Sequence, residues 1–208
     1  MARSNIPDIV IGRLPIYLRA LVRLQAEQRE ITSSHELGKR LGISSAQIRK
    51  DLSHFGEFGK QGTGYHITTL SNALQKILHV DREWRVVLVG FGNLGHAIAN
   101  YGGFAHRGFH VTHIFDNDPA IVGTQLPSGH TVLPMEKLQE TVRKEGIQVA
   151  MLTTPADSAQ EVADQLIAAG IRAILNYAPI VIYVPEGVQI QYIDPVIHLQ
   201  RMTYYLDK

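Results

Sequence analysis

A glycine fingerprint in the middle of the chain constrains the fold more than any other feature. An apolar run that begins at Val86 leads into Gly90, Gly92 and Gly95, and a second apolar run ends at Asp116. A strand, a glycine turn, a helix and a second strand that ends in an acid form a dinucleotide-binding unit. The fingerprint therefore predicts a parallel, doubly wound α/β domain that binds a nucleotide.

Each residue of this fingerprint has a physical role. Gly90 permits the tight turn, Gly92 lets the backbone approach a pyrophosphate, and Gly95 lets the following helix pack closely. The pyrophosphate is expected at the amino end of that helix, where unpaired N–H groups favour negative charge. Asp116 is expected to accept hydrogen bonds from the adenosine ribose, and its charge would repel a 2′-phosphate. We therefore predict NAD(H) as the cofactor; the alternative is a glycine-rich turn without a ligand.

Alternating patterns after the fingerprint complete the nucleotide fold. Helices are expected at 133–144 and 158–169, and strands at 148–153 and 173–176. This alternation predicts a Rossmann domain with a doubly wound parallel sheet, whose ligand lies at the strand ends. The candidate cofactor-binding residues are Gly90, Phe91, Gly92, Asn93, Leu94, Gly95, Asp116, Thr153, Thr154 and Asn176. For the two threonines and Asn176, the alternative is that they cap a helix or a turn.

The residues before the fingerprint differ from the rest in charge. Residues 1–85 carry 13 Lys and Arg against 8 Asp and Glu, whereas residues 86–208 carry 7 against 11. A basic module on an acidic one is typical of a polyanion-binding domain joined to a ligand-binding domain. We predict a DNA-binding domain at 1–80, an NAD(H)-binding domain at 81–193, and a terminal helix at 194–208.

The first module shows the plan of a helix-turn-helix. Helices are expected at 14–28, from Ser33 or Ser34 to a stop at Gly42, and at 46–55 after a cap by Ser44 or Ser45. A glycine-rich hairpin at 56–67 is expected to form a wing. The alternative for this hairpin is a linker.

The third helix of this module carries side chains suited to the DNA major groove. Gln47 can read adenine, and Arg49 or Lys50 can read guanine or hold a phosphate. A solvated helix face is the alternative for the two cations. With the cap and the wing, the candidate DNA-binding residues are Ser44, Ser45, Gln47, Arg49, Lys50, Lys60, Gly62, Gly64 and Tyr65.

Four segments of the chain closely resemble the Rex family of redox-sensing transcriptional repressors. They are Gln47 to Gly56, Gly62 to Tyr65, Gly90 to Gly95, and Ile174 to Pro179, in the family's order over nearly the whole chain. The resemblance implies a winged helix-turn-helix domain, a Rossmann domain and a homodimer that binds an inverted-repeat operator in double-stranded DNA. It also implies that a rise in the NADH to NAD ratio releases the DNA.

The resemblance further implies a redox switch. Arg19 matches an arginine that pairs, in the DNA-competent state, with the aspartate matched here by Asp194. Tyr101 matches the tyrosine near the nicotinamide that distinguishes the two redox states. Without the resemblance, Arg19 would be interpreted as a surface arginine, Tyr101 as a core aromatic and Asp194 as a helix cap.

Two positions depart from the family pattern. Gln61 stands where the wing usually has a basic residue, so DNA affinity there depends more on Lys60. Pro195 follows Asp194 where an apolar side chain is expected near the cofactor.

The resemblance also implies that the helix at 195–206 exchanges between subunits and contacts the partner's DNA-binding domain. The alternative is that this helix packs on its own Rossmann domain.

Other function classes fit the sequence less well. The chain has no cysteine, and its ten histidines form no convincing metal or acid–base pattern. We expect neither a membrane span nor a signal peptide. We therefore expect a cytoplasmic location. A small NAD-dependent dehydrogenase would need a proton donor and a substrate pocket beyond the nucleotide fold. A coenzyme A-binding or nucleotide-binding scaffold would not need the cations and the wing, so we predict a regulator rather than an enzyme.

Overall fold

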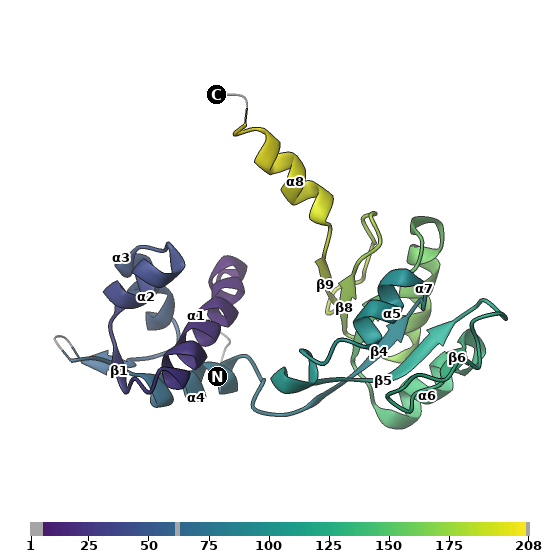
Figure 1. The fold of residues 1–208 in the computed structure, drawn as a ribbon, viewed down its shortest axis with the longest axis horizontal. Coiled ribbons are helices and arrows are strands. Elements are labelled where there is room, and N and C mark those ends of the chain that lie inside the picture. The colour runs from purple at the N-terminus through teal and green to yellow at the C-terminus, as the bar shows by residue number, and fades with distance from the viewer. Residues whose placement is uncertain (1–5, 61–62, 207–208) are drawn as a thin grey trace. The chain divides into compact units, whose positions relative to one another are not determined.

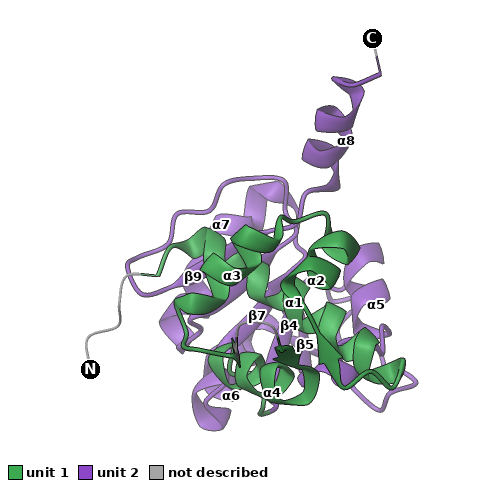
Figure 2. Ribbon diagram, turned by 90° about the vertical axis from the view of Figure 1, so that its left-hand side faces the viewer, with its two compact units in different colours: residues 1–82 green, residues 83–208 purple. Residues whose placement is uncertain are grey.

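The computed structural model describes residues 6–60 and 63–206, and the chain forms two compact units (Figures 1 and 2). Unit 1 is Met1–Arg82 and unit 2 is Glu83–Lys208. The unit boundary thus precedes the first strand of the predicted nucleotide fold. The glycine fingerprint and the helix-turn-helix therefore lie in different units.

Unit 1 is a winged helix-turn-helix domain, as predicted. In chain order it contains α1 (Asp8–Ala26), β1 (Ile31–Thr32), α2 (Ser34–Leu41), α3 (Ser45–Ser53), β2 (Gly59–Lys60), β3 (Gly64–His66) and α4 (Ile67–Ile77). The strands pair antiparallel in the order β1-β3-β2, so β2 and β3 form the hairpin of the wing. Gln61 and Gly62, which the sequence places in this hairpin, lie outside the described residues.

Local caps determine where α2 and α3 begin and end. The hydroxyl of Ser33 accepts a hydrogen bond from the backbone N–H of Glu36 at 3.1 Å, and Ser44 accepts one from Gln47 at 3.2 Å. Gly42 ends α2 in the left-handed conformation, with φ 68°. Because each cap gives a partner to an otherwise unpaired N–H, the turn between the helices is well specified.

One apolar core joins the helices α1, α2, α3 and α4 of unit 1. The residues of α1 that face it recur at helical spacing, which is why this helix packs on the others. In contrast to the predicted start at Leu14, α1 begins at Asp8 and includes Pro15 on its exposed face. The fully buried aliphatic core residues are Leu14, Leu21, Leu24, Leu37, Ile48, Ile67, Leu70 and Leu74.

Unit 2 is a Rossmann domain built on a parallel sheet of six strands. Its elements are β4 (Trp84–Val89), α5 (Asn93–Ala99), β5 (Phe109–Asp116), β6 (Val132–Pro134), α6 (Leu138–Glu145), β7 (Val149–Leu152), α7 (Ala156–Ala169), β8 (Ala173–Asn176), β9 (Gln189–Tyr192) and α8 (Pro195–Thr203). The spatial order is β6-β5-β4-β7-β8-β9, the order of a dinucleotide-binding sheet. The predicted fold class is therefore confirmed.

Both faces of this sheet are covered. Val87 and Val89 of β4 pack into a cluster with residues of α6 and α7. Val86 and Leu88, which alternate with them, pack into a second cluster that includes Ile98 of α5. Burial on both sides explains why β4 is a continuous apolar run.

The two edge strands of the sheet differ from the sequence prediction. The helix expected from residue 133 begins only at Leu138, because residues 132–134 pair with β5 as β6. The sequence analysis also missed β9, in which Gln189 and Gln191 interrupt the apolar pattern. Edge strands tolerate proline and polar residues, so their sequences resemble loops.

Candidate functional site

A cavity of about 630 Å³ lies where the strand order reverses, between β4 and β7. In open α/β sheets, ligands bind beyond the carboxyl ends of the strands at this point. The cavity brings together the glycine turn, the acid after β5 and the end of β7. The predicted cofactor residues that line it are Gly90, Gly92, Leu94, Asp116, Thr153 and Thr154.

Close backbone contacts hold the glycine turn. Gly90 has φ 94°, and a Cβ there would meet the backbone carbonyl carbon of Thr153 at 2.8 Å. A Cβ on Gly95 would overlap the carbonyl oxygen of Gly90, whereas a Cβ on Gly92 would meet nothing within 4 Å. Gly95 therefore allows α5 to pack on the turn, and Gly92 borders open space in the cavity.

Asp116 supports this turn as well as lining the cavity. Its side chain is buried, and its two oxygens accept hydrogen bonds from the backbone N–H groups of Phe91, at 2.6 Å, and Asp118, at 2.8 Å. A carboxylate offers about four acceptor positions, so these bonds leave room for ribose hydroxyls. The same negative charge disfavours a phosphate on the 2′ or 3′ hydroxyl of the adenosine ribose.

The two threonines after β7 have different surroundings. The Thr153 hydroxyl donates a hydrogen bond to the carbonyl of Gly90 at 2.7 Å, which ties β7 to the glycine turn. The Thr154 hydroxyl is buried and has no partner within the described part of the chain. A buried hydroxyl without a partner is costly, so Thr154 is the better candidate for a ligand contact.

Asn176 and Tyr101 are predicted cofactor residues that do not line the cavity. Asn176 is buried, accepts from the N–H of Ala178 at 2.9 Å and donates to its carbonyl at 3.0 Å, so it closes the turn after β8. Tyr101 is 56% exposed and packs edge-to-face on Phe104. Cofactor contacts by Asn176 and Tyr101 stay predictions.

Three further fingerprint residues also lie outside the lining, namely Phe91, Asn93 and Gly95. Phe91 donates its N–H to Asp116, Asn93 is the first residue of α5, and Gly95 supports the turn. The sequence analysis missed several lining residues. Ser158, Glu161 and Gln165 project from one face of α7, and their helical spacing was the available signal.

The outward face of α3 presents the predicted DNA-binding cations. Arg49 and Lys50 are exposed, together with Ala46 and Ser53 at helical spacing. The Arg49 guanidinium donates to the exposed hydroxyl of Ser34 at 3.1 Å. These two cations can therefore reach a polyanion without breaking a buried contact.

The other predicted DNA-binding residues frame this helix. Ser44 caps α3, and Ser45 is its first residue. Gly64 and Tyr65 lie in β3 of the wing, and Lys60 ends β2. Burial raises the pKa of Tyr65, which packs against the core of unit 1.

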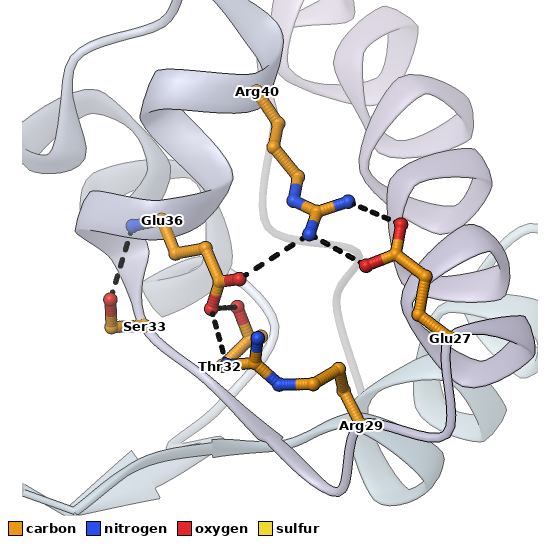
Figure 3. A network of polar contacts seen from close by, with 6 residues as sticks. All are labelled: Glu27, Arg29, Thr32, Ser33, Glu36 and Arg40. Atoms are coloured by element: carbon orange, nitrogen blue, oxygen red, sulfur yellow. Dashed lines mark hydrogen bonds and ion pairs between the residues drawn. The ribbon is translucent and has the colours of Figure 1, made fainter.

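Surface ion pairs hold α2 against the carboxyl end of α1 (Figure 3). Arg40 binds both carboxylate oxygens of Glu27 at 2.7 Å, and this contact lowers the pKa of Glu27. Glu36 accepts a hydrogen bond from the Thr32 hydroxyl at 2.9 Å. Exposed pairs of this kind contribute little stability each, so their main effect is to orient α2.

Asp51 on the inner face of α3 is a buried acid that the sequence analysis missed. It accepts hydrogen bonds from Arg13 at 2.5 and 2.7 Å, from the Tyr17 hydroxyl at 2.6 Å and from the Gln47 amide at 2.7 Å. Burial alone would raise its pKa, but these hydrogen bonds outweigh burial, and the pKa of Asp51 is lowered. The sequence does contain a sign of this buried acid, because Asp51 comes three residues after Ile48 and so lies on the apolar face of the helix.

Residues 6–60 and 63–206 form neither a membrane-spanning helix nor a metal cluster. No helix there combines the length and apolar character that a membrane crossing requires. In the same residues, no group of three or more His, Cys, Asp or Glu side chains is arranged to hold a metal ion.

Comparison with known proteins places both units in context. A family model for a putative DNA-binding protein N-terminus matches residues 5–53, and one for a CoA binding domain matches residues 81–180. The redox-sensing transcriptional repressor Rex of Roseiflexus sp. (strain RS-1) is 52% identical over 200 residues, which are 96% of this chain and 90% of that protein. The repressor Rex of Chloroflexus aurantiacus (strain ATCC 29366 / DSM 635 / J-10-fl) is 48% identical over 99% of this chain and 97% of its own length.

Solved structures match over nearly the whole chain. The crystal structure of RSP in complex with beta-NAD+ and operator DNA has a TM-score of 0.93 and 38% identity, and the match covers 98% of this chain and 94% of that one. The crystal structure of RSP in complex with beta-NADH has a TM-score of 0.88 and 36% identity, with coverage of 98% and 95%.

Alanine substitutions at two glycines should separate turn geometry from ligand contact. Gly95→Ala should destabilise unit 2 by about 1–3 kcal/mol, because the new methyl group overlaps the Gly90 carbonyl. Gly92→Ala should change stability by less than about 0.5 kcal/mol but should weaken NADH binding, because its methyl group enters the cavity. Urea unfolding and calorimetric titration with NADH measure the two effects. Wild-type NADH affinity in Gly92→Ala would contradict the assignment of the cavity.

Replacing Asp51 by Asn should remove a pH-dependent part of the stability of unit 1. The native pKa of Asp51 lies below its ordinary value of 3.8, so its stabilisation is complete above pH 3.8. The stabilisation is then lost as the pH falls through the lower native pKa. At pH 7 the substitution should cost about 3 kcal/mol, since it leaves Arg13 without its carboxylate.

Urea unfolding of unit 1, followed at pH 7 and at about pH 3, checks this expectation. The difference in unfolding free energy between the wild type and the variant should shrink at the lower pH. An equal difference at both values would show that Asp51 is not ionised in the native state.

Proposed function

Since this chain belongs to the Rex family of redox-sensing transcriptional repressors, we propose that it binds operator DNA through unit 1 and leaves the DNA when NADH occupies unit 2. The observation that carries the proposal is that one chain joins the exposed cationic face of α3 to a dinucleotide cavity. The relatives that it matches over nearly their whole length are named redox-sensing transcriptional repressors. The chain is thus a regulator, not an enzyme.

On the DNA side, α3 is the helix that would enter the major groove. Helix-turn-helix proteins place the first residues of this helix against base edges, with the amino end near phosphates. Ser44 and Ser45 lie at that end, and Arg49 and Lys50 lie on the exposed face. Lys60 and the other wing residues would contact the backbone or the minor groove beside it.

On the cofactor side, NAD(H) fits the cavity of unit 2. Gly92 borders open space where a pyrophosphate can approach, and Thr154 has a buried hydroxyl to offer. The nicotinamide supplies the signal, because reduction removes its positive charge. Asp116 disfavours both NADP(H) and coenzyme A, since each carries an extra phosphate on the 2′ or 3′ hydroxyl of the adenosine ribose.

The rival dehydrogenase is disfavoured by the relatives and not by the cavity. Hydride transfer to a carbonyl needs a proton donor beside the substrate, and Glu161 and Tyr177 of the described lining are groups of that kind. The relatives that match nearly the whole chain, however, are named as repressors.

A homodimer is part of the proposal. The helix α8 buries none of its described residues, although most of its large side chains are apolar. Such a helix needs a cover, and we propose that a second copy of the chain supplies it through exchange of α8. A symmetric dimer would account for an inverted-repeat operator, because each copy would bind one half of the repeat. Since the proposed target is DNA, we also propose that the protein acts in the cytoplasm.

We also propose that Arg19 and Asp194 form the pair that reports the redox state together with Tyr101. Arg19 is exposed on α1 in unit 1. Asp194 caps α8 in unit 2, where one of its oxygens accepts from the N–H of Val196 at 2.9 Å. Its second oxygen is available to accept a hydrogen bond from an arginine guanidinium. Pro195, the next residue, is compatible with the first turn of α8.

A gel-shift titration at fixed salt tests the repressor function. The chain should shift one specific duplex both without a cofactor and with NAD. NADH should release the duplex, whereas NADPH and coenzyme A should have little effect. Lys50→Gln should weaken DNA binding without changing NADH affinity. Asp116→Ala should weaken NADH binding without changing the affinity for DNA. Specific binding that is indifferent to NADH would exclude the sensor function.

Analytical ultracentrifugation tests the dimer. Leu199→Glu together with Met202→Glu puts charges on the exposed apolar face of α8 and should convert the dimer to monomers. His198→Glu adds a charge to the same helix without removing an apolar contact and serves as the control. A wild-type chain that sediments as a monomer at micromolar concentration would contradict the proposal.

A further inference from the structure

Gln47 connects the exposed face of α3 with the buried network beneath it. The residue lies in the first turn of the helix and is half-buried. Its side-chain nitrogen, Nε2, lies 2.7 Å from Oδ1 of Asp51, one turn further along. The first turn of this helix is the part that reaches base edges in helix-turn-helix proteins. The predicted reader of adenine is therefore held in place by the protein itself.

Asp51 also determines which atoms of the Gln47 amide remain free to contact a base. An ionised carboxylate only accepts hydrogen bonds, so the amide must present its NH₂ group and not its oxygen to Asp51. The NH₂ group has two hydrogens, and only one is needed for this bond. The amide oxygen and the second N–H remain, and they match the N6 donor and the N7 acceptor of adenine.

The position of Asp51 is set by α1. Arg13 contacts both oxygens of the carboxylate, and the hydroxyl of Tyr17 donates to Oδ2. The same oxygen that accepts from Gln47, Oδ1, accepts from Nη2 of Arg13 at 2.7 Å. A glutamine held in this way loses less conformational freedom when it binds DNA.

We propose that Asp51 is a positioning residue that presents Gln47 to one adenine–thymine base pair in each half of the operator. This inference rests on the proposed function and adds a source of base specificity to it. By contrast, Arg49 and Lys50 have no buried anchor among the contacts described, and they suit phosphates or a less constrained base contact.

The test uses the full chain and an operator selected by the wild type from a pool of random duplexes. Each base pair of that operator is then changed in turn, and affinity is measured at one salt concentration. Wild-type binding should fall on the order of ten- to a hundredfold when one A·T pair per half-site is changed. Gln47→Ala should lose this discrimination and keep the discrimination at other positions.

Asp51→Asn should relax discrimination at the same base pair. Combining it with Gln47→Ala should bring no further loss of discrimination there, because the two residues act through one contact. If Asp51 only stabilised unit 1, its substitution would weaken binding to all duplexes alike. The selectivity at one base pair is thus the readout that a purely structural role would not change.

Two further variants separate positioning from stability. Tyr17→Phe removes one hydrogen bond from Asp51 but leaves its contact with Gln47, so it should lower the melting temperature and retain the discrimination. Arg13→Met with Asp51→Asn removes both charges, and it replaces the single variant if the latter is too unstable to assay. This paired variant should also lose discrimination at the base pair that Gln47 reads.

Two results would overturn the inference. In one, Gln47→Ala keeps the wild-type base preferences; in the other, removal of the Asp51 carboxylate leaves the preference at the Gln47 base pair intact. A wild-type chain that selects no duplex would instead exclude the proposed function, and this inference with it. The two failures are therefore distinguishable.

Discussion

The close approach of α5 to the turn after β4 is the constraint on which the cofactor site depends. Only a glycine at 95 leaves room for the Gly90 carbonyl, and this contact keeps the amino end of α5 beside the switch point of the sheet. The same turn is held by the Thr153 hydroxyl and by Asp116, through the N–H of Phe91. The backbone groups that would bind a pyrophosphate are thus fixed before the ligand arrives.

Features set by local physics could be predicted from the sequence. The turn at Gly90 follows from a backbone conformation that favours glycine, and the starts of α2 and α3 follow from the hydroxyls of Ser33 and Ser44. The buried strand β4 follows from its unbroken apolar run. In each case the signal is contained within a few neighbouring residues, which is why it can be recognised without a structure.

Features that depend on distant partners were not predicted. β6 and β9 become strands because they pair with β5 and β8, although Pro134 and the glutamines of β9 weaken their own strand pattern. Asp51 is an ordinary helix acid until α1 brings Arg13 and Tyr17 to it. The face of α7 that lines the cavity is defined only once β7 is placed beside β4.

A buried acid supports the ligand-binding element in each unit. Asp116 holds the glycine turn through its hydrogen bond from the N–H of Phe91, and Asp51 ties α3 to α1 through bonds from Arg13 to both of its oxygens. In unit 1 this arrangement joins α3 to α1, the helix that also carries Arg19. A contact that shifts α1 at Arg19 must therefore either carry α3 with it or break the bonds to Asp51. Because breaking a buried charged contact is costly, a displacement of α1 is expected to carry α3 with it, so the proposed charge pair at Arg19 would act on the proposed DNA-reading face without touching it.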